Sequence, residues 1–138
     1  MRMSVAAICA SGLLLGACGT DTATIAQYNG IGADETIYFS GNEPFWGGET
    51  TGETLRYTTP EHPDGSMFSV RRFAGNNGLG ITGSLEGKSF DMVVTPGTCL
   101  DTMADRAYPY VVTLMLNKEL REGCGWTERQ PFTATTRD

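Results

Sequence analysis

The chain has few of the side chains on which nucleophilic and metal-dependent enzymes rely. Its 138 residues include a single histidine, His62, and only four cysteines. Neither a Gly-x-Ser-x-Gly nor a Cys-x-x-Cys motif occurs, and His62 lies in a proline-rich segment typical of a turn. Zinc takes three or four nitrogen, sulfur or carboxylate ligands from a protein, and the chain has few histidine and cysteine residues to provide them. We therefore expect no metal, no cofactor and no enzymatic activity.

Positive charge is also scarce. The chain has 10 lysine and arginine residues against 16 aspartate and glutamate residues, and a formal net charge of −6. Its longest basic run is the pair Arg71-Arg72. An acidic surface repels the phosphates of nucleic acids and of anionic lipids. We therefore expect no nucleic acid partner.

Long apolar runs are missing except at the start of the chain. Arg2 precedes an apolar segment over residues 5–15, and Leu15-Gly16-Ala17-Cys18 completes it. A basic start, a short apolar core, small residues and then cysteine resemble a bacterial lipoprotein signal. The run is too short to span a bilayer. These features predict a signal peptide over residues 1–17; an ordinary signal peptide cut elsewhere is the alternative.

Cys18 would then be the first residue of the mature chain and would carry the lipid. Two or three acyl chains hold a protein on a membrane almost permanently. Gly19 follows where an aspartate can mark inner-membrane retention, so we expect an anchor in the outer membrane, facing the periplasm. Residues 18–34 are rich in small and polar residues and show no hydrophobic period, which predicts a flexible lipidated tether. Residues 35–138 are then a single domain.

The domain shows the alternation of apolar and polar residues that is typical of β-strands. Turn residues, such as Pro63-Asp64-Gly65 and Glu86-Gly87, separate the alternating segments. We predict an all-β fold, a small antiparallel β-barrel or sandwich of about seven to nine short strands. Residues 100–106 are predicted to form one short helical turn. The longest apolar segment, Tyr108–Leu116, is predicted to be a strand buried on both sides or near the barrel interior.

Cys9 lies in the predicted signal peptide and Cys18 would carry the lipid, so two cysteines remain in the domain. In the oxidising periplasm, Cys99 and Cys124 are predicted to form a disulfide. A zinc site or a redox pair are the alternatives for these two thiols.

Two segments carry specific motifs. Residues 41–46 are Gly-Asn-Glu-Pro-Phe-Trp, and residues 99–110 are Cys-Leu-Asp-Thr-Met-Ala-Asp-Arg-Ala-Tyr-Pro-Tyr, with Gly123-Cys124 further on. Residues 39–125 thereby resemble a family of small, uncharacterised bacterial lipoproteins or membrane proteins. Its members pair Asn-Glu-Pro-Phe-Trp with Cys-x-Asp-Gly-Met-Ser-Asp-x-x-Tyr-Pro and a late Gly-Cys. The matching residues are Asn42, Glu43, Pro44, Phe45, Trp46, Cys99, Asp101, Met103, Asp105, Tyr108, Pro109 and Cys124.

The resemblance implies a β-rich domain, related to META-type and lysozyme-inhibitor-like domains, but no established activity. The chain departs from the family pattern at Thr102, where glycine is expected, and at Ala104, where serine is expected. If the backbone needs a positive φ at residue 102, threonine is a poor fit there.

Four residues are candidates for binding: Glu43, Trp46, Tyr108 and Tyr110. Glu43 beside Trp46 in a cleft would gain proton affinity, whereas in the alternative Phe45 and Trp46 fill the core and Glu43 accepts backbone hydrogen bonds. The two tyrosines are either an aromatic wall for a ligand or part of the core.

Asp101 and Asp105 are one helical turn apart and are open to two interpretations. They would either face a cation or cap the short helix and form a salt bridge to Arg106 or Arg121. Paired with Glu43, one of them would supply the second carboxylate of a hydrolase.

The predicted function is therefore a binding or structural module of the cell envelope. Its expected partner is another envelope protein, a glycan or a small apolar ligand. The first alternative is an inhibitor of a cell-wall hydrolase such as lysozyme, which an acidic protein would reach by electrostatic steering. The second alternative is the carboxylate-dependent hydrolase.

Overall fold

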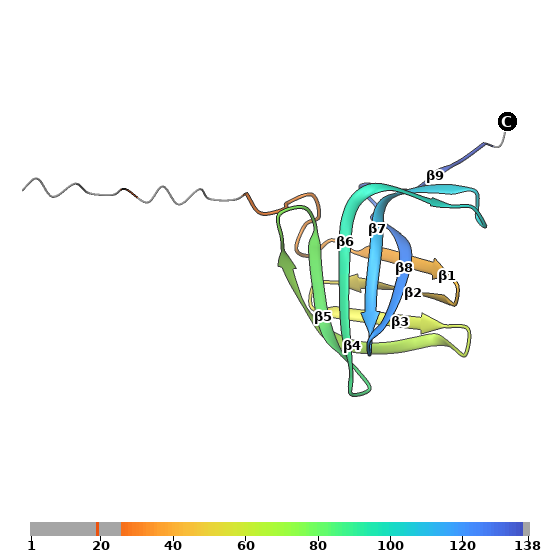
Figure 1. Ribbon diagram of the computed structural model, residues 1–138, viewed down its shortest axis with the longest axis horizontal. Coiled ribbons are helices and arrows are strands. Elements are labelled where there is room, and N and C mark those ends of the chain that lie inside the picture. Colours follow the sequence, from red (N-terminus) through yellow and green to blue (C-terminus); the bar gives the residue numbers. More distant parts are fainter. Residues whose placement is uncertain (1–18, 20–25, 137–138) are drawn as a thin grey trace, which may run out of the picture.

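The computed structural model describes residue 19 and residues 26–136, which form an antiparallel β-barrel (Figure 1). The predicted signal peptide and Cys18 lie outside the described residues. Among the residues described, no helix is long and apolar enough to cross a membrane. The strands are β1 (Ile37–Asn42), β2 (Phe45–Thr51), β3 (Thr54–Thr59), β4 (His62–Ala74), β5 (Leu79–Leu85), β6 (Lys88–Asp101), β7 (Arg106–Leu116), β8 (Glu119–Trp126) and β9 (Thr133–Ala134).

Strands β1 to β7 each pair antiparallel with the next strand in the sequence, and β8 pairs with β1 to close the barrel. The predicted all-β antiparallel barrel is confirmed. β6 and β7 continue beyond the barrel wall as a long hairpin, and the short β9 pairs with β7 at its outer end, where Arg106 faces Ala134. Figure 1 shows this hairpin curling over one end of the barrel.

The barrel interior is filled by the alternating apolar residues of the strands. An eight-stranded barrel has an interior just wide enough to be filled by side chains. The largest side chains with less than 2% of their surface exposed are Tyr110, Phe90, Ile37, Leu55, Ile81, Met92, Leu114, Val94, Val112, Thr50 and Thr127. β7 buries one face only, because Val111 is 37% exposed and Met115 is 39% exposed. Its expected burial on both sides is therefore wrong, whereas its place at the interior is confirmed.

The predicted helical turn at residues 100–106 is also wrong. Residues 102–105 form the turn of the β6–β7 hairpin, and the flanking residues are paired as strands. The residue with a left-handed backbone is Asp105, with a φ of 50°, and not Thr102. Threonine at residue 102 is therefore compatible with the backbone, and aspartate is one of the residues that tolerate a positive φ.

Residues 28–34 belong to the domain, although their composition indicated a tether. Ile31 is 7% exposed and belongs to the core, and Tyr28 packs against it. The backbone N–H of Tyr28 donates to the carbonyl of Gly75 at 2.7 Å. Two apolar side chains among many small residues show no period, so the sequence did not reveal that this segment covers one end of the barrel.

Arg72 holds this segment from inside the barrel. Its guanidinium donates to the carbonyl oxygens of Glu35 at 3.0 Å, Ala33 at 3.3 Å and Thr50 at 2.7 Å. Burial lowers the pKa of Arg72, while the nearby carboxylates of Asp34 and Glu35 act in the opposite direction. A buried guanidinium needs such acceptors, so the N-terminal segment and Arg72 depend on each other.

The disulfide between Cys99 and Cys124 is confirmed, with a Cα–Cα distance of 5.6 Å. It joins β6 to β8 across β7 on the outside of the barrel, because Cys124 pairs with the outward-facing Val111. Both sulfur atoms are used by this bond, so the two residues are not available as thiolate ligands for zinc.

Candidate functional site

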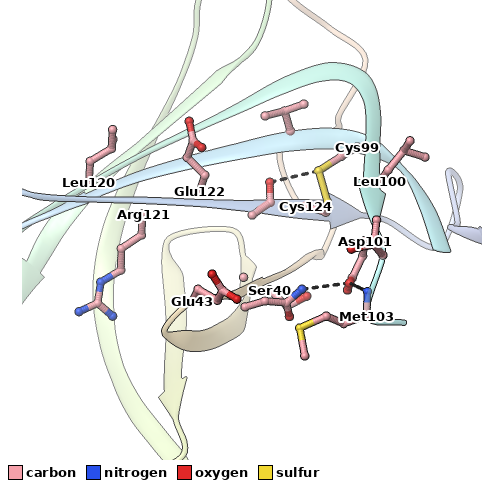
Figure 2. Close-up of a pocket in the computed structure, with 15 residues that line it drawn as sticks. Ser40, Glu43, Cys99, Leu100, Asp101, Met103, Leu120, Arg121, Glu122 and Cys124 are labelled. Carbon is pink, nitrogen blue, oxygen red and sulfur yellow. Dashed lines mark hydrogen bonds between the residues drawn. A yellow bond between two sulfur atoms is a disulfide. The ribbon is translucent and has the colours of Figure 1, made fainter. Parts of the chain in front are cut away.

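A groove about 670 Å³ in volume lies on the outer surface of the barrel, where β1 and β8 separate. Pairing between these strands stops at Ser40 and Cys124, so the wall of the barrel opens beyond that point. Figure 2 shows Glu43 and Ser40 on one side of the groove, Glu122 and Cys124 on the other, and Asp101 and Met103 at one end. We call it the motif groove; its lining residues are 40–43, 99–103, Val111 and 120–124.

The two sequence motifs meet in this groove through one hydrogen bond. The Nδ2 group of Asn42 donates to Oδ1 of Asp101 at 2.9 Å, across 59 residues of sequence. The same oxygen accepts the backbone N–H groups of Met103 at 3.0 Å and Ala104 at 3.2 Å. Asp101 therefore caps the hairpin turn and attaches it to the end of β1.

Asp101 thus caps a hairpin turn and not the predicted helical turn, and the predicted salt bridge to Arg121 is not present. The guanidinium of Arg121 donates instead to the hydroxyl of Tyr57 at 2.7 Å and to Oε2 of Glu119 at 3.2 Å. Asp105 lies outside the lining of the groove, and its carbonyl accepts the N–H of Thr135 at 2.8 Å. Within the described residues, no group of three or more potential metal ligands is present.

The disulfide forms part of the groove wall and fixes its width. Cys99 Sγ contacts the carbonyl oxygen of Gly123 at 3.4 Å, and Cys124 is 7% exposed. The β6–β7 hairpin is therefore attached covalently to β8 at the place where it borders the groove (Figure 2). A surface held in this way loses little conformational entropy when a partner binds.

Exposed apolar side chains gather in the groove. Leu100 is 65% exposed, Met103 is 63% exposed and Leu120 is 59% exposed, while Val111 contributes a smaller exposed area. Single exposed apolar residues are ordinary on protein surfaces, but a cluster in one hollow marks an interaction site. The groove thus offers apolar side chains at both of its ends, Leu120 at one and Leu100 with Met103 at the other, with polar surface between them.

The charge of the groove is negative. Glu43, Asp101 and Glu122 line it, and the cation that lines it among the described residues is Arg121, already paired with Glu119. An apolar surface with carboxylates at its edge is complementary to a segment that carries apolar and cationic side chains.

Two glycines allow the groove to form next to the indole of Trp46. A Cβ atom at Gly41 would overlap the Nε1 atom of Trp46, and one at Gly123 would overlap the carbonyl oxygen of Ser40 and lie 3.1 Å from Cζ2 of Trp46. Both positions therefore require glycine for the close approach of β1, β8 and the indole.

Of the four candidate binding residues, Glu43 alone lines the motif groove. Trp46 is 4% exposed and stacks on Tyr57, with ring centroids 6.3 Å apart, as the core alternative predicted. Phe45, which that alternative placed in the core, is 53% exposed. It lies with Trp46 beside a shallower depression of about 380 Å³ on another side of the β1–β2 hairpin.

The two candidate tyrosines are also buried. Tyr108 is 5% exposed and packs against Phe132 at 5.3 Å, and Tyr110 is 1% exposed inside the barrel. Burial raises the pKa of Tyr110, and neighbouring Tyr28 and Glu35 act in the same direction. Both rings therefore support the fold, and neither forms an aromatic wall in the groove.

The arrangement offers little to the carboxylate hydrolase. Glu43 is exposed, so the partial burial that a general acid would need at this position is missing. Asp101 shares the groove with Glu43, but its Oδ1 already accepts three hydrogen bonds. These bonds to one carboxylate oxygen fix the position of Asp101 and give it a structural role in the hairpin turn.

The sequence did not reveal the wall of the groove that β8 forms opposite residues 40–43. Leu120 and Glu122 alternate outward on β8 and carry no motif, and only the closure of β8 onto β1 places them opposite residues 40–43. An outward leucine on a strand was the one available signal. In comparisons of this chain with protein-family models, curated proteins and solved structures, no match is found.

Proposed function

We propose that this protein is a lipid-anchored lipoprotein of the cell envelope that binds another envelope protein through the motif groove. The order of residues 1–18 supports the anchor, in the outer membrane and facing the periplasm. The convergence of Asn42, Glu43, the Asp101 turn and the disulfide on one apolar, acidic groove is the observation that carries the binding role.

The groove favours a polypeptide over the other ligands considered. The aromatic rings expected to hold a glycan are buried, whereas exposed leucine and methionine side chains fit the apolar side chains of a peptide. Glu43 and Glu122 would attract lysine or arginine on the same segment. The partner segment is therefore one that alternates apolar and basic residues.

Selection from a peptide display library tests this proposal. The bait is the unlipidated Cys18→Ala chain, and the expected result is enrichment of peptides that combine leucine, isoleucine or phenylalanine with lysine or arginine. Leu120→Ala and the double variant Glu43→Gln/Glu122→Gln are expected to weaken the selected peptides by about tenfold each. Selection without this bias, or binding unchanged in both variants, would reject the groove as the binding surface.

A basic cell-wall hydrolase such as lysozyme is the second candidate partner, and the negative charge of the groove favours it. Electrostatic attraction between such proteins weakens as salt is added. The protein is then expected to slow lysozyme at low ionic strength, and less so at high ionic strength. Full lysozyme activity in a molar excess of the protein at low salt rules this candidate out.

A further inference from the structure

A second pocket, which shares only Arg121 with the lining of the motif groove, opens at the end of the barrel opposite the N-terminal segment. We call it the mouth pocket; it has a volume of about 220 Å³, and Tyr57, Leu85, Leu116 and Arg121 are among the residues that line it. Its inner surface is apolar, since Leu85 and Leu116 are each 8% exposed and Tyr57 is 6% exposed. Polar and charged side chains surround this surface.

Arg121 is placed on the inside of the barrel wall. It pairs with Leu114, which is fully buried, so its side chain points inward and is only 18% exposed. Two of its five N–H donors are used, one toward the hydroxyl of Tyr57 and one toward Glu119. Glu119 is 73% exposed, and an ion pair with so exposed a carboxylate is weak and easily exchanged.

Tyr57 adds a second polar group to the inner surface. Its hydroxyl oxygen accepts the hydrogen bond from Arg121, which leaves its own proton available to donate. Burial raises the pKa of Tyr57, and Arg121 acts in the opposite direction. A neutral phenol and a guanidinium thus adjoin one small apolar surface.

The other charged groups of the mouth pocket lie at its rim. Lys88 and His62 are exposed and add positive charge or donors, while Glu86 is an exposed carboxylate on the β5–β6 turn. An anion at the inner surface would therefore meet Arg121 and Tyr57 and would compete with Glu119 for the guanidinium. Guanidinium groups bind carboxylates in a two-point geometry that suits such exchange.

We infer that the mouth pocket binds a small organic carboxylate with a compact apolar body. Its volume equals that of about seven water molecules at about 30 Å³ each, which suits an acid of benzoate size. The carboxylate takes the free donors of Arg121 and the Tyr57 proton, and the apolar body covers Leu85 and Leu116. The two sites share Arg121, but Glu43, Leu120 and Glu122, on which the proposed function depends, do not line the mouth pocket, so each proposal can fail without the other.

Titration of the Cys18→Ala chain with sodium benzoate, followed by NMR, tests this inference. Saturable shifts are expected at Tyr57, Leu85 and Leu116, with a dissociation constant in the millimolar range. Benzyl alcohol has the same phenyl ring as benzoate but no charge, and inorganic phosphate is an anion without an apolar group. Both are expected to bind at least about tenfold more weakly than benzoate.

Three substitutions make the test specific. Arg121→Met is expected to weaken benzoate at least about tenfold, whereas Arg71→Met, an equal change of charge on the outer face, leaves it unchanged. Glu119→Gln is a change at an exposed position that preserves the fold, and it is expected to tighten benzoate by freeing the guanidinium. No saturable shift at the pocket, phosphate binding as tight as benzoate, or no gain in Glu119→Gln would each overturn the inference.

Discussion

At the residue scale, Asp101 joins the two motif segments that border the motif groove. One carboxylate oxygen receives the side chain of Asn42 and two backbone N–H groups of the hairpin turn. The motif over residues 99–110 has an aspartate here, but its role follows only from the meeting of β1 with the β6–β7 hairpin. A motif residue can thus define a site by holding two segments together without contacting a ligand.

Replacing Asp101 by alanine is expected to lower the free energy of unfolding by about 1–2 kcal/mol, because three hydrogen bonds are lost at a partly exposed position. Asn42→Ala removes one of them and is expected to cost about 0.5–1 kcal/mol. Urea denaturation measures both. Asp91→Ala, at an exposed position of β6, is the control and is expected to change stability by less than about 0.5 kcal/mol. Equal values for Asp101→Ala and Asp91→Ala would contradict this role.

Glu35 gives the barrel a dependence on pH. Burial acts to raise its pKa, but hydrogen bonds from Arg129 and the N–H of Gly32, with the charge of Arg129, outweigh burial and lower it below the ordinary 4.5. A lowered pKa in the folded state means that the stabilising contribution is complete above the unfolded value. It is then lost as the pH falls through the folded value.

We therefore expect Glu35→Gln to be less stable than the wild type at neutral pH, and the difference to disappear well below pH 4.5. Thermal unfolding over a pH series measures this difference. The exposed Glu53→Gln is the matched control and is expected to show no such convergence. A wild-type advantage that stayed constant down to the lowest pH would show that Glu35 acts by packing alone.

At the scale of the elements, alternation predicted the strands because one face of each strand is buried in a filled barrel. Ile37 with Phe39 and Leu55 with Tyr57 are buried as this period requires. The same logic failed for residues 100–106, where a helical spacing of Leu100, Met103 and Ala104 turned out to be an exposed hairpin turn. Spacing in so short a segment cannot distinguish a turn from a helix.

The motif groove itself could be predicted only in part. The two motifs indicated that residues 41–46 and 99–110 matter together, and the disulfide indicated where the second of them is attached. The opposite wall at residues 120–122 depends on how far β1 and β8 pair before they separate, and this depends on the closure of the whole barrel. No local sequence pattern indicates the residue at which pairing between β1 and β8 ends.

The disulfide is the element that holds the β6–β7 hairpin against β8. It closes a loop with a sequence separation of 25, and on the chain-entropy estimate such a link stabilises a fold by about 3 kcal/mol. The double variant Cys99→Ala/Cys124→Ala is expected to lose this amount in urea denaturation. A reducing agent should lower the stability of the wild type toward that of the variant, and leave the variant unchanged. A reducing agent that affected both equally would contradict the assignment.

At the scale of the whole molecule, the account joins an acidic barrel to a proposed lipid anchor. Residues 28–34 cover one end of the barrel, while the motif groove and the mouth pocket are lined mainly by residues of the strands and their turns. Proposed binding surfaces on such strands are held more precisely than surfaces on loops.

Cys18→Ala is expected to move the protein from the membrane fraction to the soluble fraction of the envelope, because the lipid would be its attachment. Cell fractionation followed by immunoblotting measures the distribution. Cys9→Ala, a change of the same kind within the predicted signal peptide, is the control and should leave the protein with the membranes. Membrane retention of Cys18→Ala would contradict the proposed anchor.

Site-directed photocrosslinking in living cells tests the central proposal most directly, namely that the motif groove contacts an envelope protein. A photoreactive residue replaces Leu120 in the groove or, as the control, Met67, which is 63% exposed on β4. The account predicts one discrete crosslinked species from residue 120, diminished by Glu43→Gln/Glu122→Gln, and none from residue 67. The same species from both positions, or a residue 120 product that the double variant leaves intact, would contradict it.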